Sequence, residues 1–264
     1  MTDDRILNYR VQGREKGEGE PLFILHGLFG NMDNLTPVAR RLAEQYQVIS
    51  VDLRNHGRSF HDEEMNYQVM AADVVRLMDH LAIEQAIVLG HSMGGKTAMQ
   101  MALDFPQRIK AIIVGDIAPV SYTHRHENVI QAIENYQPEL ATSRAEADAQ
   151  FARFIEMPAV RQLLIKSLMR NDQGEFVWRM NAPALVANYD EIRSEPDNTG
   201  KSFTGPVLFV KGGESDYLLP EHKSVIGALF PNASLKVVSG VGHWLHAEKP
   251  ELFNGIVERF LSEL

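Results

Sequence analysis

The chain has 264 residues, of which 44% are hydrophobic and 23% are charged, a composition typical of ordinary globular proteins. Its formal net charge of −9 argues against duplex nucleic acid as the main partner, because such binding relies on Lys and Arg replacing counterions. The chain contains no cysteine, which excludes disulfides, thiolate metal sites and a cysteine nucleophile.

The sequence contains no recognisable targeting or membrane segment. The acidic N-terminus leads directly into residues 6–11, without a long apolar stretch or a small-residue cleavage site, so we expect a cytoplasmic protein. The longest apolar runs are far shorter than the roughly 20 residues that span a bilayer. We therefore expect no membrane insertion.

Short apolar runs alternate with helical patterns along most of the chain. Met70, Val74, Leu77, Met78 and Leu81, for example, form one apolar stripe at helical spacing. Because the short runs have few polar residues, as strands covered on both faces do, we expect a parallel sheet with crossover helices. The predicted strands are 21–25, 48–51, 86–89, 109–114, 206–210 and 235–238. A further run at 6–11 is followed by a polar, Gly-rich stretch at 13–20, which predicts a solvated hairpin loop.

The alternation stops between about residues 120 and 203. No clear strand is predicted there, and 129–136, 144–155 and 159–169 combine helical spacing with good helix formers. The segment ends in the turn-rich sequence 194–200. We therefore expect an α/β core formed by 1–119 and 204–264, and a helical cap insertion formed by 120–203.

The segment 86–99 predicts a buried strand, a sharp turn and a helix, with Ser92 at the turn. Gly90 and Gly94 flank the serine, and small residues are needed there because such a turn packs against neighbouring backbone. The turn raises the Ser92 hydroxyl above the edge of the sheet. The helix N-terminus favours negative charge, and Met93 N–H is a candidate donor to an oxyanion.

A second glycine-containing turn, His26-Gly27-Leu28-Phe29-Gly30, follows the strand 21–25. Its backbone amides can supply the other half of an oxyanion hole, with Leu28 N–H as the candidate. This motif, then the segment 52–59, then Gly-His-Ser-Met-Gly-Gly, resembles the α/β-hydrolase superfamily over nearly the whole chain. The resemblance implies a mostly parallel sheet with helices on both faces and a helical cap inserted after the sixth strand.

Two histidines, His26 and His91, lie in the two glycine-containing turns, and His243 and His246 lie near the C-terminus. In superfamily members with these motifs, histidines at the positions of His26 and His91 support the turns, and the segment 52–59 is a structural turn. His243 follows the last predicted strand in Gly-Val-Gly-His and matches the late catalytic histidine of the superfamily. We therefore expect His243 to be the base that removes the proton of Ser92. His246, three residues later, lacks that loop context.

Two carboxylates are candidates for the acid that orients His243. Asp216 follows the strand 206–210, the commonest location of the acid in the superfamily, and Asp116 directly follows the strand 109–114, where some branches place it. The chain most resembles the YbfF-type bacterial esterases, whose Gly-Asp-Ile-Ala-Pro and Gly-Gly-x-Ser-Asp-Tyr segments it matches. This resemblance favours Asp116, with Ser215 as an assisting hydroxyl, over Asp216.

The same resemblance implies that an arginine early in the cap and the tyrosine of Ser-Asp-Tyr anchor bulky substrates. Arg125 and Tyr217 are the candidates in this chain, with a one-residue gap needed to align 121–126 with the family pattern. His124 and His126 form a His-x-His pair without a supporting acidic cluster, so we expect no metal site.

These residues predict two-step acyl transfer without a cofactor, in which Ser92 attacks the carbonyl group and water later hydrolyses the acyl-enzyme. The expected substrate is a small-molecule acyl ester or thioester, such as an acyl-CoA, and the expected assembly is a monomer or homodimer. Carbon-carbon bond hydrolysis and perhydrolysis use the same triad and stay as alternatives. A non-enzymatic ligand receptor of the same fold is the alternative from a different class.

Overall fold

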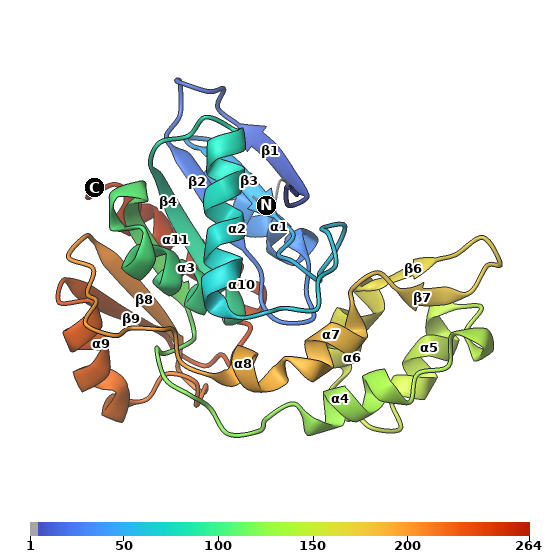
Figure 1. Ribbon diagram of the computed structural model, residues 1–264. Helices are drawn as coiled ribbons and strands as arrows, with labels where there is room; N and C mark the ends of the chain where they lie inside the picture. Colours follow the sequence, from blue (N-terminus) through green and yellow to red (C-terminus); the bar gives the residue numbers. More distant parts are fainter. Residues whose placement is uncertain (1–4) are drawn as a thin grey trace.

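The computed structural model describes residues 5–264; residues 1–4, which belong to the predicted core, lie outside the described residues. Within this range, seven strands form one sheet in the order β1-β3-β2-β4-β5-β8-β9 (Figure 1). Only β1 runs antiparallel to its neighbour, so the prediction of a mostly parallel sheet is confirmed. The strands are β1 (Tyr9–Gly13), β2 (Pro21–Leu25), β3 (Gln47–Val51), β4 (Ala86–His91), β5 (Ile109–Gly115), β8 (Val207–Gly212) and β9 (Ala233–Val238).

The N-terminal strands differ from the prediction in their pairing. β1 pairs with β3, with Tyr9 opposite Val51, and not with β2, so the predicted hairpin at 13–20 is wrong. Both edges of β2 are occupied by the parallel neighbours β3 and β4. The segment predicted to form the cap insertion begins after the fifth described strand and not after the sixth, because β1 is the only sheet strand between residue 5 and β2.

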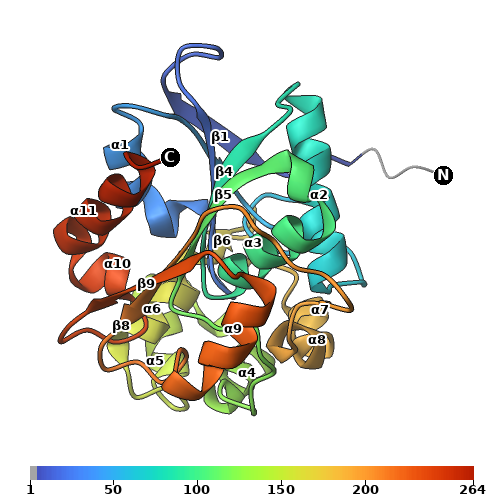
Figure 2. The same cartoon turned by 90° about the vertical axis from the view of Figure 1, so that its left-hand side faces the viewer.

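Helices cover both faces of the sheet (Figure 2). Val88 packs in the core under α2 and α3, whereas Leu89 packs in the core under α1 and α11, because successive side chains of a strand point to opposite faces. The core helices are α1 (Thr36–Leu42), α2 (Tyr67–His80), α3 (Met93–Asp104), α9 (Lys223–Leu229), α10 (Leu245–Glu248) and α11 (Pro250–Leu261). Short 3-10 helices are η1 (Met32–Leu35), η2 (Pro106–Arg108), η3 (Pro138–Leu140) and η4 (Pro220–His222).

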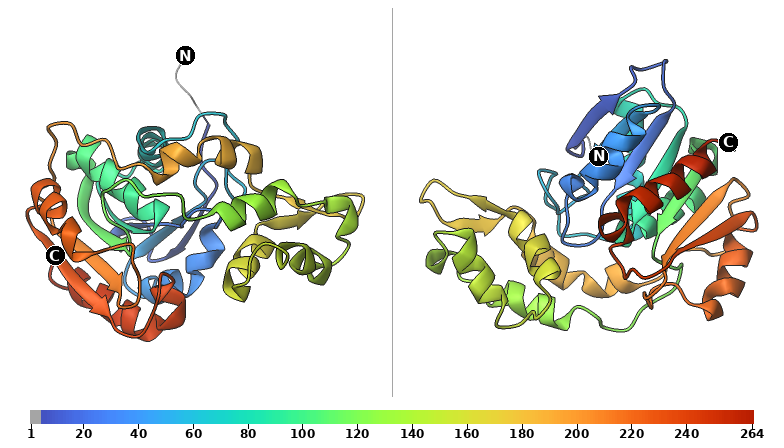
Figure 3. Two further views of the ribbon diagram at one scale, coloured as in Figure 1. Left: turned by 90° about the horizontal axis from the view of Figure 1, so that it is seen from below. Right: turned by 180° about the vertical axis from the view of Figure 1, so that it is seen from behind.

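The segment between β5 and β8 folds beside the sheet and projects beyond it (Figures 1 and 3). Its helices are α4 (Glu127–Glu134), α5 (Arg144–Phe151), α6 (Pro158–Lys166), α7 (Ala182–Ala187) and α8 (Tyr189–Arg193). Contrary to the prediction, it also contains a hairpin of β6 (Leu168–Arg170) and β7 (Phe176–Trp178). The turn between them uses Gly174 at φ +85, and three-residue strands are too short to show the alternation that identifies a strand.

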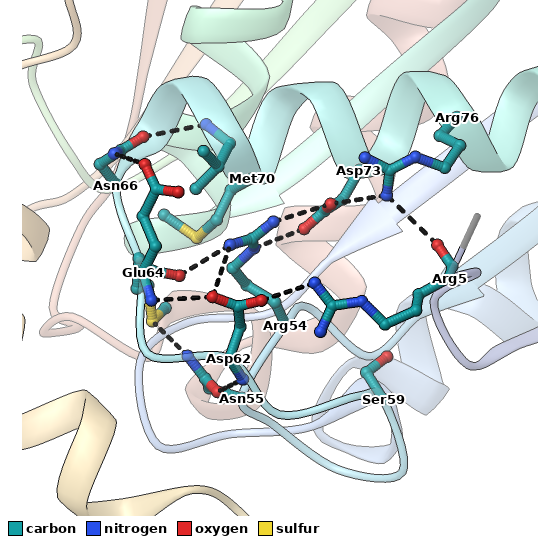
Figure 4. A network of polar contacts seen from close by, with 12 residues as sticks. Arg5, Arg54, Asn55, Ser59, Asp62, Glu64, Asn66, Met70, Asp73 and Arg76 are labelled. Atoms are coloured by element: carbon teal, nitrogen blue, oxygen red, sulfur yellow. Dashed lines mark hydrogen bonds and ion pairs between the residues drawn. The ribbon is translucent and has the colours of Figure 1, made fainter. Parts of the chain in front are cut away.

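The loop after β3 is fastened to α2 by a buried ion pair (Figure 4). Arg54 Nε and Nη2 donate to the two carboxylate oxygens of Asp73 at 2.6 and 2.9 Å, and Arg54 Nη1 donates to Glu64 O at 2.7 Å. A buried pair with its donors satisfied in this bidentate way holds one geometry. The arrangement agrees with the structural role expected for the segment 52–59.

Candidate active site

Ser92 lies at the junction between β4 and α3, as the sequence predicts. Its backbone has φ 54 and ψ −120, a conformation that L-residues rarely adopt and that the surroundings must hold. A Cβ atom on Gly90 would lie 2.1 Å from Gly94 O, and one on Gly94 would lie 2.4 Å from Leu25 O. The two glycines are therefore required by close backbone contacts on both sides of the turn.

The two residues whose backbone amides are expected to bind an oxyanion, Leu28 and Met93, line the same pocket as Ser92. Within residues 5–264, neither Leu28 N–H nor Met93 N–H donates to another protein group. The turn that carries Leu28 lies against the serine, since a Cβ atom on Gly27 would be 3.4 Å from Ser92 Cβ. Two unused donors beside one hydroxyl can serve an anionic oxygen.

His243 contacts Asp116 and not Asp216. His243 Nδ1 lies 2.7 Å from Asp116 Oδ2, and Asp116 Oδ1 accepts a 2.8 Å hydrogen bond from Gly212 N. Asp116 is completely buried and has φ +50. By contrast, the side chain of Asp216 is 70% exposed and pairs with Arg125 at 2.6 Å. Of the two carboxylates left open by the sequence, the tertiary structure therefore places only Asp116 against the histidine.

Ser215 lies beside the same carboxylate. Its Oγ donates to Asp116 Oδ2, the oxygen that also faces His243, and accepts a 3.2 Å hydrogen bond from Tyr217 N. Asp116 is thus contacted by Ser215, Gly212 and His243. Several partners around one buried carboxylate satisfy its oxygens and hold it in place.

Arg125 and Tyr217 lie together next to His243. The ring of Tyr217 is stacked on the imidazole of His243, with centroids 4.0 Å apart and an interplanar angle of 23°. The guanidinium of Arg125 lies 4.8 Å from the centre of the Tyr217 ring. Burial raises the pKa of the Tyr217 hydroxyl to about 12, so this side chain stays neutral beside the arginine.

The other histidines occupy supporting positions. His26 Nε2 accepts a 3.1 Å hydrogen bond from Leu53 N, and His91 Nε2 lies 2.8 Å from His243 O. Burial lowers the pKa of the His26 imidazole and lowers that of His91 well below its usual value. Burial also lowers the pKa of His246 to about 3, and its ring lies against His91 with centroids 4.4 Å apart.

A narrow pocket of about 40 Å³ opens at Ser92. Sequence reasoning missed several of its polar lining residues, namely Tyr67, Lys96, Tyr122, Tyr189 and Arg193. Among these residues, only Lys96 could have been expected from the sequence, because it lies one helical turn after Ser92, on α3, and therefore on the same face as the serine. The aromatic residues among these come from α2 and from the segment between β5 and β8, and the sequence does not reveal which of their side chains turn toward the serine.

His126 also lines this pocket, although the sequence suggested nothing for it beyond a His-x-His pair. Its Nδ1 lies 2.8 Å from the hydroxyl of Tyr189, and its Nε2 lies 3.4 Å from the hydroxyl of Tyr217. Burial lowers the pKa of His126 to about 4. Across the described residues, no group of three or more His, Cys, Asp or Glu is arranged to hold a metal ion.

None of the helices in residues 5–264 is long and apolar enough to cross a membrane. A parallel α/β sheet with a serine at the strained turn after a central strand is the architecture of an α/β hydrolase. The family model for the alpha/beta hydrolase fold matches residues 20–250.

Full-length relatives agree with this class. The chain is 37% identical to "Esterase YbfF" of Escherichia coli strain K12, over 97% of this chain and 99% of that protein. It is 36% identical to "sn-1-specific diacylglycerol lipase ABHD11" of Mus musculus, over 91% and 80%. The solved structure of a marine microorganism esterase superposes with a TM-score of 0.92 at 36% identity, over 97% and 99%. The chain therefore belongs to the α/β-hydrolase fold family, among its esterases and lipases, and the predicted resemblance is confirmed.

Proposed function

We propose that this carboxylic ester hydrolase cleaves small acyl esters and acyl thioesters, acyl-CoA included, with Ser92 as the nucleophile, His243 as the base and Asp116 as the acid. The observation that carries the proposal is the 2.7 Å contact between His243 Nδ1 and the buried carboxylate of Asp116. The Asp116 contact fixes the proton on Nδ1, so Nε2 is the basic nitrogen of the imidazole.

The reaction then runs in two steps. His243 Nε2 takes the proton of Ser92 Oγ as the oxygen bonds to the carbonyl carbon, and the oxyanion accepts hydrogen bonds from Leu28 N–H and Met93 N–H. The imidazolium returns the proton to the leaving alcohol or thiol, which departs and leaves an acyl-enzyme. Water, deprotonated by the same nitrogen, then cleaves the acyl group from the serine.

Ser215 supports this arrangement from the side of the acid. Its hydroxyl donates to the Asp116 oxygen that faces His243, and so keeps the carboxylate in place when the imidazole moves. Asp216 takes no part in proton transfer in this scheme, because its exposed carboxylate pairs with Arg125. Its role is to hold the arginine.

We assign substrate selection to residues 120–203, acting as a cap on the core formed by 1–119 and 204–264. Arg125 and Tyr217 meet at the boundary between these parts, next to His243. They would contact the acyl chain or the leaving group of a bulky substrate. A pocket of about 40 Å³ is smaller than a drug-sized ligand site, so a long acyl chain requires the cap to shift.

Labelling with a fluorophosphonate probe tests the nucleophile. Wild type should be labelled and Ser92→Ala should not, whereas Ser262→Ala, at the exposed C-terminal end, should react like wild type. An unlabelled wild type would favour a non-enzymatic receptor. Equal labelling of wild type and Ser92→Ala would remove Ser92 from the mechanism.

A substrate panel tests the chemistry. We expect turnover of aryl esters and of acyl-CoA thioesters, measured as kcat/KM, because both form the same acyl-enzyme. A vinylogous diketone and a peracid-forming assay complete the panel. Faster turnover of either of these than of every ester would replace ester hydrolysis by carbon-carbon bond hydrolysis or perhydrolysis.

A further inference from the structure

The turn that carries Leu28 N–H contains a strained residue. Gly30 N donates to Gly27 O at 3.1 Å, which closes a four-residue turn with Leu28 and Phe29 in the centre. Phe29 has φ 61 and Leu28 has no positive φ, the combination found in type II turns. Glycine is favoured at the position of Phe29, because a Cβ atom disfavours the left-handed region. The surroundings must therefore hold Phe29 in this conformation.

Two side chains hold the backbone on either side of Phe29. Phe29 N donates to His56 Nε2 at 3.2 Å, and Ser167 Oγ donates to Phe29 O at 2.6 Å. His56 Nδ1 lies 2.9 Å from Arg54 O. Burial lowers the pKa of His56 to about 3, so the imidazole stays neutral and its Nε2 accepts from Phe29.

The two supports come from different parts of the molecule. His56 lies in the loop after β3, which the buried contacts of Arg54 fasten to α2. Ser167 directly follows α6 of the cap and is only 3% exposed. The Phe29 side chain is buried as well, and its ring packs edge-on against His126 at the start of the cap, with centroids 6.1 Å apart.

We propose that Ser167 is a positioning residue, which orients Leu28 N–H for the oxyanion by holding Phe29 in its left-handed conformation when the cap is seated. The inference rests on the function proposed above. If the hydrogen bond to Phe29 O is lost, the peptide group after Phe29 can rotate and the turn relaxes. Leu28 N–H then turns away from Ser92. Seating of the cap and assembly of the oxyanion hole are thereby one event.

The hydroxyl of Ser167 can be tested with matched variants. Ser167→Ala should lower kcat on a short aryl ester about tenfold with KM within about twofold, a smaller effect than removal of an oxyanion donor, because the Leu28 amide is displaced but still present. Fluorophosphonate labelling should slow by a similar factor. Ser143→Ala is the control, since it removes a different cap hydroxyl, which accepts from Glu146 N at the start of α5, and it should leave kcat unchanged.

Ser167→Thr and Ser167→Val separate the hydroxyl from packing, because the two side chains have nearly the same shape. This pair also decides the matter if Ser167→Ala fails to fold. Threonine should keep kcat within about threefold of wild type, and valine should resemble alanine.

Three results would overturn the inference: equal kcat for threonine and valine, a change in KM alone, or a lower melting temperature of Ser167→Ala with wild-type kcat. Failure of wild type to react with the probe would instead refute the proposed function.

Discussion

His91 Nε2 and His243 O are 2.8 Å apart, so the residue before Ser92 contacts the backbone of the residue that faces Asp116. The contact requires a proton on His91 Nε2. Burial lowers the pKa of His91 well below its usual value and so keeps the ring neutral. A neutral ring with its one proton on Nε2 donates to the carbonyl. The strained turn and the last loop of the chain are thereby held together.

The assignment of the acid predicts unequal effects for two conservative substitutions. Asp116→Asn should lower kcat on an aryl ester by about 10⁴-fold, as loss of the histidine partner does in other triads. Asp216→Asn should keep kcat within about threefold, since its side chain contacts Arg125 and not His243. An inactive Asp216→Asn beside an active Asp116→Asn would reverse the assignment.

Buried histidines should make the protein labile to acid. Burial lowers the pKa of His26, His56, His91, His126 and His246 in the folded state, whereas the unfolded chain binds these protons near pH 6.5. The stabilisation is therefore present above about pH 6.5 and is lost as the pH falls toward the folded-state values. Each histidine should lower the free energy of unfolding by about 1.4 kcal/mol per pH unit in that range.

Denaturant unfolding at several pH values between about 6 and 5, below the pKa of the unfolded-state histidines, measures this slope. His246 offers the simplest variant, because its buried Nδ1 has no hydrogen-bond partner within residues 5–264. His246→Leu should reduce the slope by about 1.4 kcal/mol per pH unit. A slope identical to that of wild type would show that His246 is not neutral in the folded protein.

Lys96 joins both ends of the cap to α3. It is 1% exposed, and its Nζ donates to Val120 O at 2.8 Å and to Arg193 O at 3.1 Å. Hydrogen bonds from a charged donor contribute about 1.5–3 kcal/mol each. Lys96→Met should therefore speed limited proteolysis of the cap connections, near residues 120 and 194, by at least about tenfold.

The global stability of this variant should behave differently. Burial opposes the charged form of Lys96 and lowers its pKa to about 7. The cost of burying the ammonium offsets part of its hydrogen bonding, so the melting temperature of Lys96→Met should fall by only a few degrees. Lys110→Met is the control, because Lys110 pairs with Glu20 away from the cap. Equal proteolysis of the two variants would contradict the role given to Lys96.

Two glycine substitutions should have opposite effects on stability. Gly57 has φ +55, and a Cβ atom there would lie 2.1 Å from Asp52 Cγ, so Gly57→Ala should destabilise the fold by about 2–4 kcal/mol. Gly227 lies within α9 with nothing within 4 Å of its added Cβ, so Gly227→Ala should stabilise by about 0.5–1 kcal/mol. Urea unfolding measures both, and similar values for the two would refute the steric explanation.

Local patterns in the sequence were sufficient for much of the fold. Largely apolar runs such as 86–89 and 109–114 predicted buried strands that are present as β4 and β5, because burial on both faces favours apolar residues at nearly every position. The turn at Ser92 was predictable because Gly-x-Ser-x-Gly after an apolar run is the local pattern of such a turn, although the contact that requires Gly94 comes from Leu25 O. The hairpin of β6 and β7 was missed because three residues show no period.

The surroundings of His243 depended on contacts between distant segments. Asp116 and Asp216 both follow strands, and adjacent parallel strands bring their carboxyl ends to the same edge of the sheet. Their positions alone therefore left both open, and only the family resemblance favoured Asp116. In the tertiary structure, Asp216 pairs with Arg125, whereas Asp116 is buried against His243. The contact of Ser167 with Phe29 likewise joins residues 138 positions apart. Local sequence patterns thus determine the order of the elements and their buried faces. The hydrogen-bond partners of Asp116, Asp216 and Ser167 depend instead on how distant segments pack together in the tertiary structure.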